Sequence, residues 1–166
     1  MNIRIRKASE SDYKELQKLI EGITDLHINK YPMIYSKPKS KINNKESIKT
    51  IINDKLIFLC LAEVDGRIVG YIQASVRKVT KEQILVPREY IKLDSIFIQK
   101  PFRKIGIGKK LLQGLFSWSK KQRISSIELN VYDKSKEAIK MYEKYGFKIE
   151  RYHMRKEIKR PTRASS

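Results

Sequence analysis

One stretch of this chain, Leu93–Leu112, constrains its fold more than any other. It reads LDSIFIQKPFRKIGIGKKLL, which predicts an apolar strand at residues 96–98, a basic turn with two glycines, and then an amphipathic helix. A strand that enters a helix through a glycine-containing turn gathers backbone N–H groups at the positive end of the helix dipole. The stretch therefore predicts a site for an anionic phosphate, beside the charges of Lys104, Lys109 and Lys110.

Two common phosphate-binding motifs do not fit this turn. A P-loop needs G-x-x-x-x-G-K-[ST], but here the second glycine follows the first after one residue, and no Ser or Thr follows the lysine. A dinucleotide fingerprint needs a third glycine at the position of Leu111. What remains is Arg103-x-x-Gly106-x-Gly108 between a strand and a helix.

This pattern resembles the acyl-CoA-binding motif of the GNAT superfamily of N-acetyltransferases, [RQ]-x-x-G-x-[GA], and Phe102 before the arginine matches as well. One departure is Lys104, which stands where a glycine often follows the arginine; a lysine still keeps its backbone N–H. The resemblance implies acetyl-CoA as acyl donor and no metal. The cofactor-binding residues that it implies are Ile96, Phe97, Ile98, Arg103, Lys104, Ile105, Gly106, Ile107, Gly108, Lys109 and Ser135.

A second part of the resemblance follows, with a strand at 129–132, a helix that begins after Ser135, and the pair Gly146-Phe147. GNAT enzymes carry a tyrosine at the position of Tyr142, which implies a proton donor to the departing thiolate. A tyrosine with an ordinary pKa near ~10 is protonated at neutral pH and can serve this role. The residues alone favour a packed core tyrosine, because Tyr142 shares a helical face with other apolar side chains, and it is the family resemblance that favours the catalytic role.

The general base is harder to identify. Some GNAT enzymes carry a glutamate at positions that are Lys92 and Asn130 here, so this role does not carry over. Asp94 alternates onto the strand face of Lys92 and Ile96 and is our candidate, acting through a water. A strand-edge aspartate paired with a lysine is the structural alternative. An α-amine acceptor, with a pKa near ~8, would need no strong base.

The predicted elements alternate along the whole chain. Strands are expected at 3–5, 56–64, 67–79, 90–98, 127–132, 147–150 and 152–158, and helices from Ser9, from about Asn44 to Ile52, from the turn to about Lys121, and from Ser135 to Tyr145. The dipeptide Asp65-Gly66 predicts a tight hairpin. This order is similar to that of GNAT proteins, which implies a mixed, mostly antiparallel α/β sheet with helices on both faces and a splayed central strand pair. We expect a single domain over residues 1–159 and a disordered polar tail over 160–166.

The segment Gly22–Lys45 contains two prolines and scattered polar residues, which favours a loop. In GNAT folds the corresponding loop borders the acceptor pocket, so His27 and Tyr31 are the substrate-contacting candidates. A lone histidine without a ligand cluster gives no metal site.

Composition limits the partners. The 166 residues carry a formal net charge of +19, which favours polyanionic partners such as nucleic acid, a ribosome or an acidic protein, and equally fits a solvated lysine-rich surface. No nucleic-acid-binding motif accompanies this charge. The single cysteine, Cys60, and the absence of a long apolar run favour a cytoplasmic protein that does not enter the membrane.

The resemblance to GNAT proteins therefore implies an acetyl-CoA-dependent N-acetyltransferase that moves an acetyl group directly to a primary amine in a ternary complex. A basic nucleic-acid- or ribosome-binding module and a non-catalytic acyl-CoA sensor are the alternatives. The acceptor, a protein N-terminus, a lysine or a small amine, is left open, as are the acyl chain and whether the chain forms a homodimer. Strong positive charge disfavours polycationic acceptors such as aminoglycosides.

Overall fold

The computed structural model describes residues 1–39, 44–81 and 84–158, so the predicted tail at 160–166 lies outside the described residues. The chain divides into two compact units, Met1–Asn130 and the residues from Val131 on, and each is described by itself.

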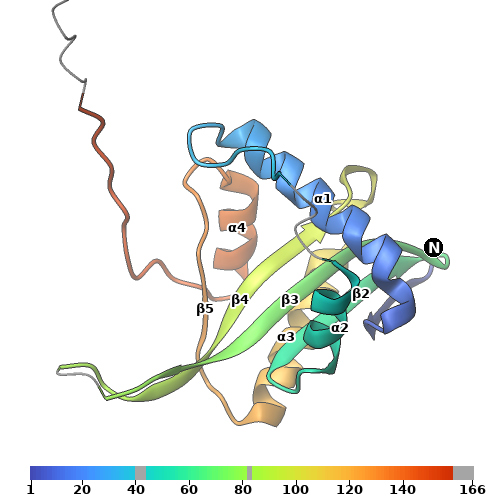
Figure 1. Ribbon diagram of the computed structural model, residues 1–166. Coiled ribbons are helices and arrows are strands. Elements are labelled where there is room, and N and C mark those ends of the chain that lie inside the picture. Colours follow the sequence, from blue (N-terminus) through green and yellow to red (C-terminus); the bar gives the residue numbers. More distant parts are fainter. Residues whose placement is uncertain (40–43, 82–83, 159–166) are drawn as a thin grey trace, which may run out of the picture. The chain divides into compact units, whose positions relative to one another are not determined.

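The first unit is built on a five-stranded sheet in the order β1-β2-β3-β4-β5 (Figure 1). The strands are β1 (Ile3–Lys7), β2 (Ile57–Val64), β3 (Arg67–Val79), β4 (Arg88–Ile98) and β5 (Ile127–Leu129). The first four pair antiparallel and β5 runs parallel to β4. The predicted mixed, mostly antiparallel sheet is confirmed.

Helices cover both faces of this sheet (Figure 1). They are the short 3₁₀ helix η1 (Glu10–Asp12), α1 (Tyr13–Lys30), α2 (Lys45–Asn53), the 3₁₀ turn η2 (Lys100–Phe102) and α3 (Ile107–Gln122). Leu59 and Leu61 of β2 pack under α1 and α2, in a cluster that includes Leu16 and Ile48. The neighbouring Phe58 points to the other face, where its ring lies 5.4 Å from that of Trp118 on α3. Because successive side chains of β2 point to opposite faces of the sheet, this strand contributes to the hydrophobic core on each face.

The hairpin between β2 and β3 confirms the sequence prediction. Asp65 and Gly66 have φ angles of 48° and 80°, the left-handed pair that a two-residue type I′ turn requires. The prediction at Asn44 is also confirmed, since its side chain caps α2 by accepting a bond of 2.8 Å from the Ser47 amide.

The predicted loop starts too early at Gly22, because α1 continues to Lys30, and the described residues 31–39 that follow lie outside helix and strand. Gly22 lies inside the helix, where a Cβ atom would come within 2.9 Å of the Phe97 ring on β4. The glycine therefore lets the helix approach the sheet closely and does not end it. Tertiary packing overrides the low helix propensity of glycine at this position.

In the second unit, α4 (Lys136–Lys144) follows Ser135 as predicted, and Gly146 ends the helical region with a φ of 87°. The two strands predicted at 147–150 and 152–158 are wrong: the structure shows no strand over residues 147–158. Their apolar residues are exposed, with Ile149 at 58% and Met154 at 90%. Period-two patterning cannot make a strand without a neighbour that accepts its hydrogen bonds.

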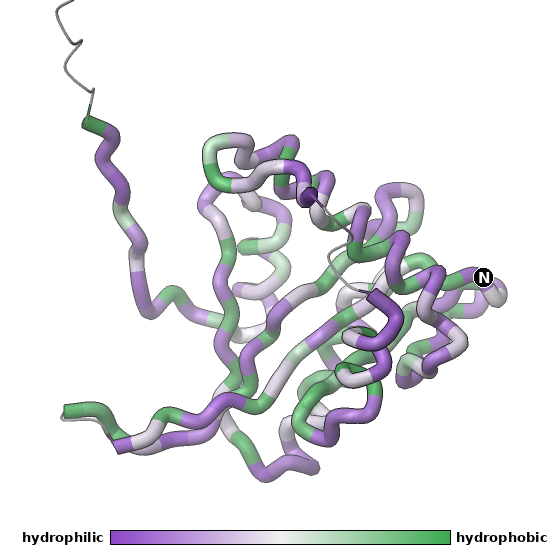
Figure 2. The backbone as a smooth tube through the Cα atoms, in the orientation of Figure 1, coloured by the Kyte–Doolittle hydropathy of each residue, from purple (hydrophilic) through white to green (hydrophobic). Residues whose placement is uncertain are grey.

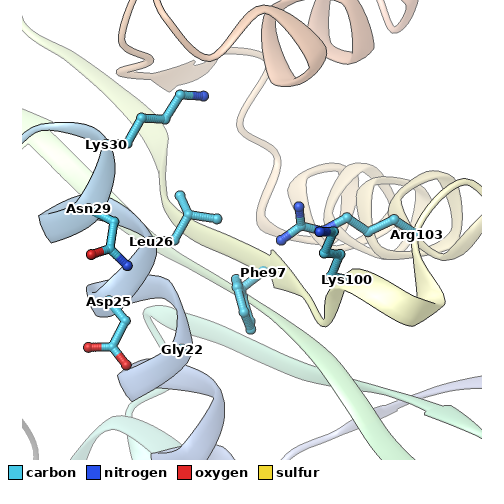
Figure 3. Close-up of a pocket in the computed structure, with 8 residues that line it drawn as sticks. All are labelled: Gly22, Asp25, Leu26, Asn29, Lys30, Phe97, Lys100 and Arg103. Carbon is cyan, nitrogen blue, oxygen red and sulfur yellow. The ribbon is translucent and has the colours of Figure 1, made fainter.

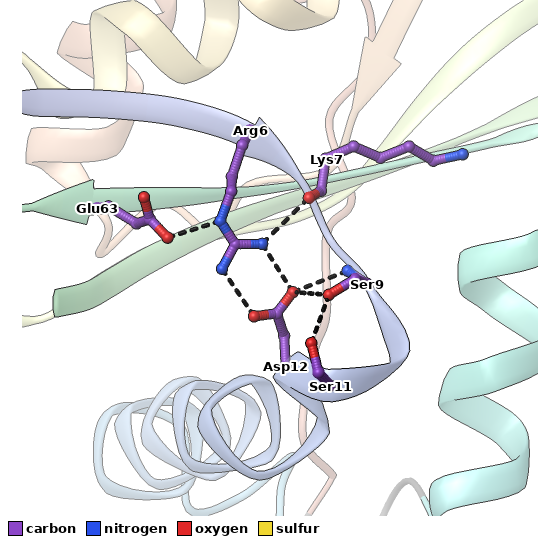
Figure 4. Close-up of polar contacts among 6 residues, drawn as sticks. All are labelled: Arg6, Lys7, Ser9, Ser11, Asp12 and Glu63. Carbon is purple, nitrogen blue, oxygen red and sulfur yellow. Dashed lines mark hydrogen bonds and ion pairs between the residues drawn. The ribbon is translucent and has the colours of Figure 1, made fainter. Parts of the chain in front are cut away.

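A charged cluster connects the short helix η1 to strands β1 and β2 (Figure 4). Arg6 on β1 donates to both carboxylate oxygens of Asp12 at 2.7 Å and, through Nε, to Glu63 of β2 at 2.6 Å. Asp12 also accepts the Ser9 N–H at 2.8 Å, which completes a capping box. The Arg6 guanidinium holds the pKa of Asp12 far below its usual range.

Beyond the sheet core, β3 and β4 extend as a two-stranded arm (Figure 1). Figure 2 shows hydrophobic colouring at the end of this arm. In the connection between β3 and β4, Ile84, Leu85 and Val86 expose 91, 51 and 75% of their surfaces.

Candidate cofactor site

The turn after β4 is shaped by Arg103 and by two left-handed residues. The Nε of Arg103 donates to the carbonyl of Ile98 at 2.9 Å, which ties the turn back to the end of the strand. Lys104 and Gly106 have φ angles of 64° and 90°. A glycine is therefore the favoured residue at both positions, and Lys104 adopts its conformation at a cost that glycine would not incur.

The first turn of α3 presents backbone donors to the space in front of it. Lys110 is the first residue whose amide bonds within the helix, to the carbonyl of Gly106 at 3.2 Å. The amides of Ile107, Gly108 and Lys109 precede it, and a helix supplies no acceptor for its first N–H groups. A Cβ atom added to Gly106 would meet nothing within 4 Å, so space is open beside the turn. Donors, dipole and open space together fit an anionic diphosphate.

The end of β4 has no strand on the side of β5. The parallel ladder ends at the pair Leu93 and Leu129, whereas β4 continues to Ile98. Ile96, Phe97 and Ile98 therefore lie beyond the pairing, as a splayed strand pair requires. The carbonyl of Ile98 already accepts from Arg103, and the segment pairs with β3 on its other side, so the backbone groups left for a ligand are those that face the β5 side.

A cleft of about 570 Å³ lies between the second half of α1 and the end of β4 (Figure 3). It is lined by Gly22, Asp25, Leu26, Asn29 and Lys30 from α1, and by Phe97, Lys100 and Arg103 from β4 and the turn. The Arg103 guanidinium carbon lies 6.0 Å from the centre of the Phe97 ring. Two of the predicted cofactor residues, Phe97 and Arg103, thus meet in this cleft.

The α1 residues of the cleft were missed because the helix was expected to end near Gly22. Their spacing of three and four residues places them on one helical face, so a longer predicted helix would have found them.

Asp94 lies at a β-bulge. The pairing with β3 shifts between Gln73 and Ala74, so that Ser95 faces Gln73 and Leu93 faces Ala74, with Asp94 as the extra residue. Its carboxylate accepts from the Ser75 hydroxyl at 2.7 Å and lies 3.8 Å from Arg77. The expected alternation of Asp94 with Ile96 is wrong, because the bulge inserts one residue and puts Ile96 opposite Ile72 on the α3 side.

The other predicted site residues lie elsewhere. His27 and Tyr31 belong to α1 and to its end rather than to a loop, and neither lines the cleft. The His27 ring stacks on Tyr35 with centroids 5.1 Å apart, and burial lowers the pKa of His27. Whether either residue contacts a substrate stays a prediction.

In the second unit, Ser135 is the residue before α4, and its amide donates to the carbonyl of Tyr132 at 2.9 Å. Tyr142 is 9% exposed, and its ring meets that of Phe147 edge-on at 5.5 Å. Burial raises the pKa of Tyr142 to about 12. The phenol of Tyr142 is therefore protonated throughout the physiological pH range.

Among the described residues 1–39, 44–81 and 84–158, no three His, Cys, Asp or Glu side chains gather as a set of metal ligands. None of the helices within the same ranges has the length and apolar character to cross a bilayer.

A glycine-containing turn at the start of α3, beside a splayed β4–β5 pair in a mixed sheet, is the arrangement of a GNAT-type acetyltransferase fold. The family model for the acetyltransferase (GNAT) family matches residues 20–147, and the chain belongs to this family.

Known proteins resemble it at two levels. An N-alpha-acetyltransferase of Sulfurisphaera tokodaii is 32% identical over 93 residues, which cover 53% of this chain and 54% of that protein. Other curated relatives are matched over as little as 38% of their length, so the chain spans about half or less of them.

Among solved structures, a protein of Bacillus halodurans superimposes with a TM-score of 0.83 at 19% identity, over 95% of this chain and 100% of that one. AAC(6′)-Iy in complex with a bisubstrate analogue, CoA-S-monomethyl-acetylneamine, superimposes with a TM-score of 0.71 at 16% identity, over 95% and 99%. At such identities these two structures establish the shared fold.

Proposed function

We propose that this protein is an acetyl-CoA-dependent N-acetyltransferase that moves an acetyl group to a primary amine by direct attack in a ternary complex. The observation that carries the proposal is the turn, where Arg103 bonds to the end of β4 and Lys104 and Gly106 are left-handed before the first amides of α3. These groups would form a cradle for a diphosphate. When bound, acetyl-CoA would supply the acetyl group as a reactive thioester. The solved relative with a CoA-containing analogue supports this choice of cofactor.

The backbone supplies the remaining contacts. The amides from Lys104 to Lys109 would hold the diphosphate, and the strand end at Ile96–Ile98 would bond the pantetheine arm. Because β5 does not pair with this part of β4, a linear ligand can lie along the strand without displacing another strand. Ser135, just before α4, would add a contact in the second unit.

Tyr142 would give its proton to the thiolate that leaves, since its raised pKa keeps the phenol protonated at neutral pH. Asp94 would accept a proton from the amine through a water. Its bond to Ser75 orients one carboxylate oxygen and leaves the other near Arg77. His27 and Tyr31 are proposed as acceptor contacts on the strength of the family resemblance alone.

The acceptor would be a protein N-terminus, a lysine of an acidic protein or a ribosome-associated protein, or a small neutral amine. Polycations are disfavoured because the chain carries a net charge of +19 and three of the residues lining the cleft are cationic. We propose that the enzyme acts in the cytoplasm. A panel of amines with a free-thiol readout identifies the acceptor class, and no thiol release with any amine would refute the proposed activity.

Substituting Tyr142 with Phe tests its role. Removing a proton donor should lower kcat by about 10²–10⁴-fold, and the affinity for CoA should stay within about twofold. The matched control is Tyr145→Phe, which removes the hydroxyl of the tyrosine directly after the same helix. This variant should keep the wild-type kcat and CoA affinity. Equal losses of kcat and CoA affinity in Tyr142→Phe would show that Tyr142 is a packing residue.

A further inference from the structure

The cleft between α1 and the turn has positive charge on both walls. Lys30, the last residue of α1, lies on one wall, and Lys100 and Arg103 lie on the other. Figure 3 shows Lys30 and Leu26 on α1, on one side of the cleft, and Arg103 and Lys100 on the opposite side. The Phe97 ring lies between the two sides. The lining contains one carboxylate, Asp25, which leaves two positive charges in excess.

The two lysines of the cleft lack an acidic partner in direct contact: within the described part of the chain, no ion pair joins Lys30 or Lys100 to a carboxylate. Arg103 uses Nε to hold the Ile98 carbonyl, so its two terminal nitrogens are the ones that face the cleft. Like charges on opposite walls repel each other, and an anion between them turns this repulsion into attraction.

The cleft borders the proposed diphosphate cradle, because Arg103 lines the cleft and also belongs to the turn. The floor is apolar, formed by Leu26 and Phe97, and suits the uncharged part of a ligand whose phosphates meet the rim. Lys30 comes from an element some 70 residues earlier in the chain, outside the recognised turn pattern.

We propose that Lys30 binds a phosphate group of the cofactor from the wall opposite the turn, so that the end of α1 and the turn hold the cofactor between them. This inference rests on the proposed function, since it assigns one more contact to the same cofactor. A phosphate is the chemistry that three converging cations favour, and Arg and Lys bind it by charge-assisted hydrogen bonds.

The test is the affinity for CoA, measured by calorimetry without any acceptor. Lys30→Gln removes the charge from an exposed side chain, so the fold should be unaffected. Its Kd for CoA should rise about tenfold, as expected for the loss of one charge-assisted contact. The matched control is Lys18→Gln, an exposed lysine of the same helix that pairs with Glu15 at 2.7 Å. Its Kd should stay within about twofold of that of the wild type.

Salt separates a direct contact from a packing effect. The difference between Lys30→Gln and the wild type should shrink at 0.5 M salt, where the Debye length is only about 4 Å. An unchanged Kd in Lys30→Gln overturns the inference, and a raised KM for the acceptor in that variant would assign the anion to the acceptor instead. An equal loss of CoA affinity in Lys30→Gln and Lys18→Gln also overturns the inference, because the lower net charge of the protein would then explain both losses. Failure of the wild type to bind CoA refutes the proposed function itself.

Discussion

The cluster around Arg6 makes a quantitative prediction about stability. Substituting Asp12 with Asn keeps the shape of the side chain and removes the charge that accepts two hydrogen bonds from Arg6. The side chains of Arg6 and Asp12 are 24% and 8% exposed, so the pair lies between a surface pair and a buried one. Glu63 still faces the guanidinium in the variant, so the arginine keeps one anionic partner.

These facts set the magnitude. Hydrogen bonds to charged groups contribute about 1.5–3 kcal/mol, and breaking a fully buried pair costs about 3–5 kcal/mol. We expect Asp12→Asn to lower the free energy of unfolding by about 2–3 kcal/mol, which lowers the Tm by about 4–12 °C for a chain of this size. The control is Glu15→Gln, which breaks an exposed pair with Lys18 and should cost less than about 1 kcal/mol.

The same variant predicts a pH dependence. The pKa of Asp12 is lowered in the folded state, while the unfolded chain has an ordinary value near ~3.9. The stabilisation is therefore complete above pH ~5 and is lost as the pH falls below ~4, because the unfolded state then binds the proton first. Urea unfolding followed by Trp118 fluorescence at pH 7, 5 and 3 should show the difference between wild type and Asp12→Asn narrowing in acid. A loss below about 0.5 kcal/mol at pH 7, or a difference that persists unchanged at pH 3, would refute the reasoning.

Three further substitutions follow from the backbone and the packing. Lys104→Gly should be more stable than Lys104→Ala by about 1 kcal/mol in urea unfolding, because only glycine adopts a φ of 64° without strain, and equal stabilities would contradict this. Gly22→Ala should push the Phe97 ring toward the cleft and weaken CoA binding severalfold in calorimetry. The higher helix propensity of alanine should offset about 1 kcal/mol of the steric cost to stability. An unchanged CoA affinity would contradict a role of Phe97 in both contacts. Gln17→Leu should raise the Tm by about 2–4 °C, because the buried Nε2 of Gln17 has no acceptor, and a lower Tm would mean that the amide is satisfied in solution.

Local signals predicted the parts of the fold that depend on local chemistry. Asp65-Gly66 determines its hairpin through φ angles that few other pairs adopt, and the turn at Arg103-x-x-Gly106 precedes α3 as expected. The left-handed backbone at Lys104 accounts for the glycine that often stands at this position, and the lysine found here adopts the same conformation. In these cases the residue type and the backbone conformation are directly linked.

The errors arose where a partner distant in sequence decides the outcome. Gly22 resembles a helix end until Phe97 is seen against it, 75 residues further along the chain. The bulge at Asp94 leaves no mark in the hydrophobic pattern, yet it changes which side chains share a face. Residues 147–158 alternate like strands but do not pair as strands in the structure. The contact of Arg6 with Glu63 likewise joins residues that no local window contains.

Phe97 packs against Gly22 of α1 and also lines the cleft. A ligand in the cleft therefore affects how α1 packs on the sheet. Any molecule that fills the cleft supports this ring and so favours the native chain by mass action. Melting curves recorded across CoA and its acylated and truncated analogues can therefore rank candidate cofactors before any turnover has been detected.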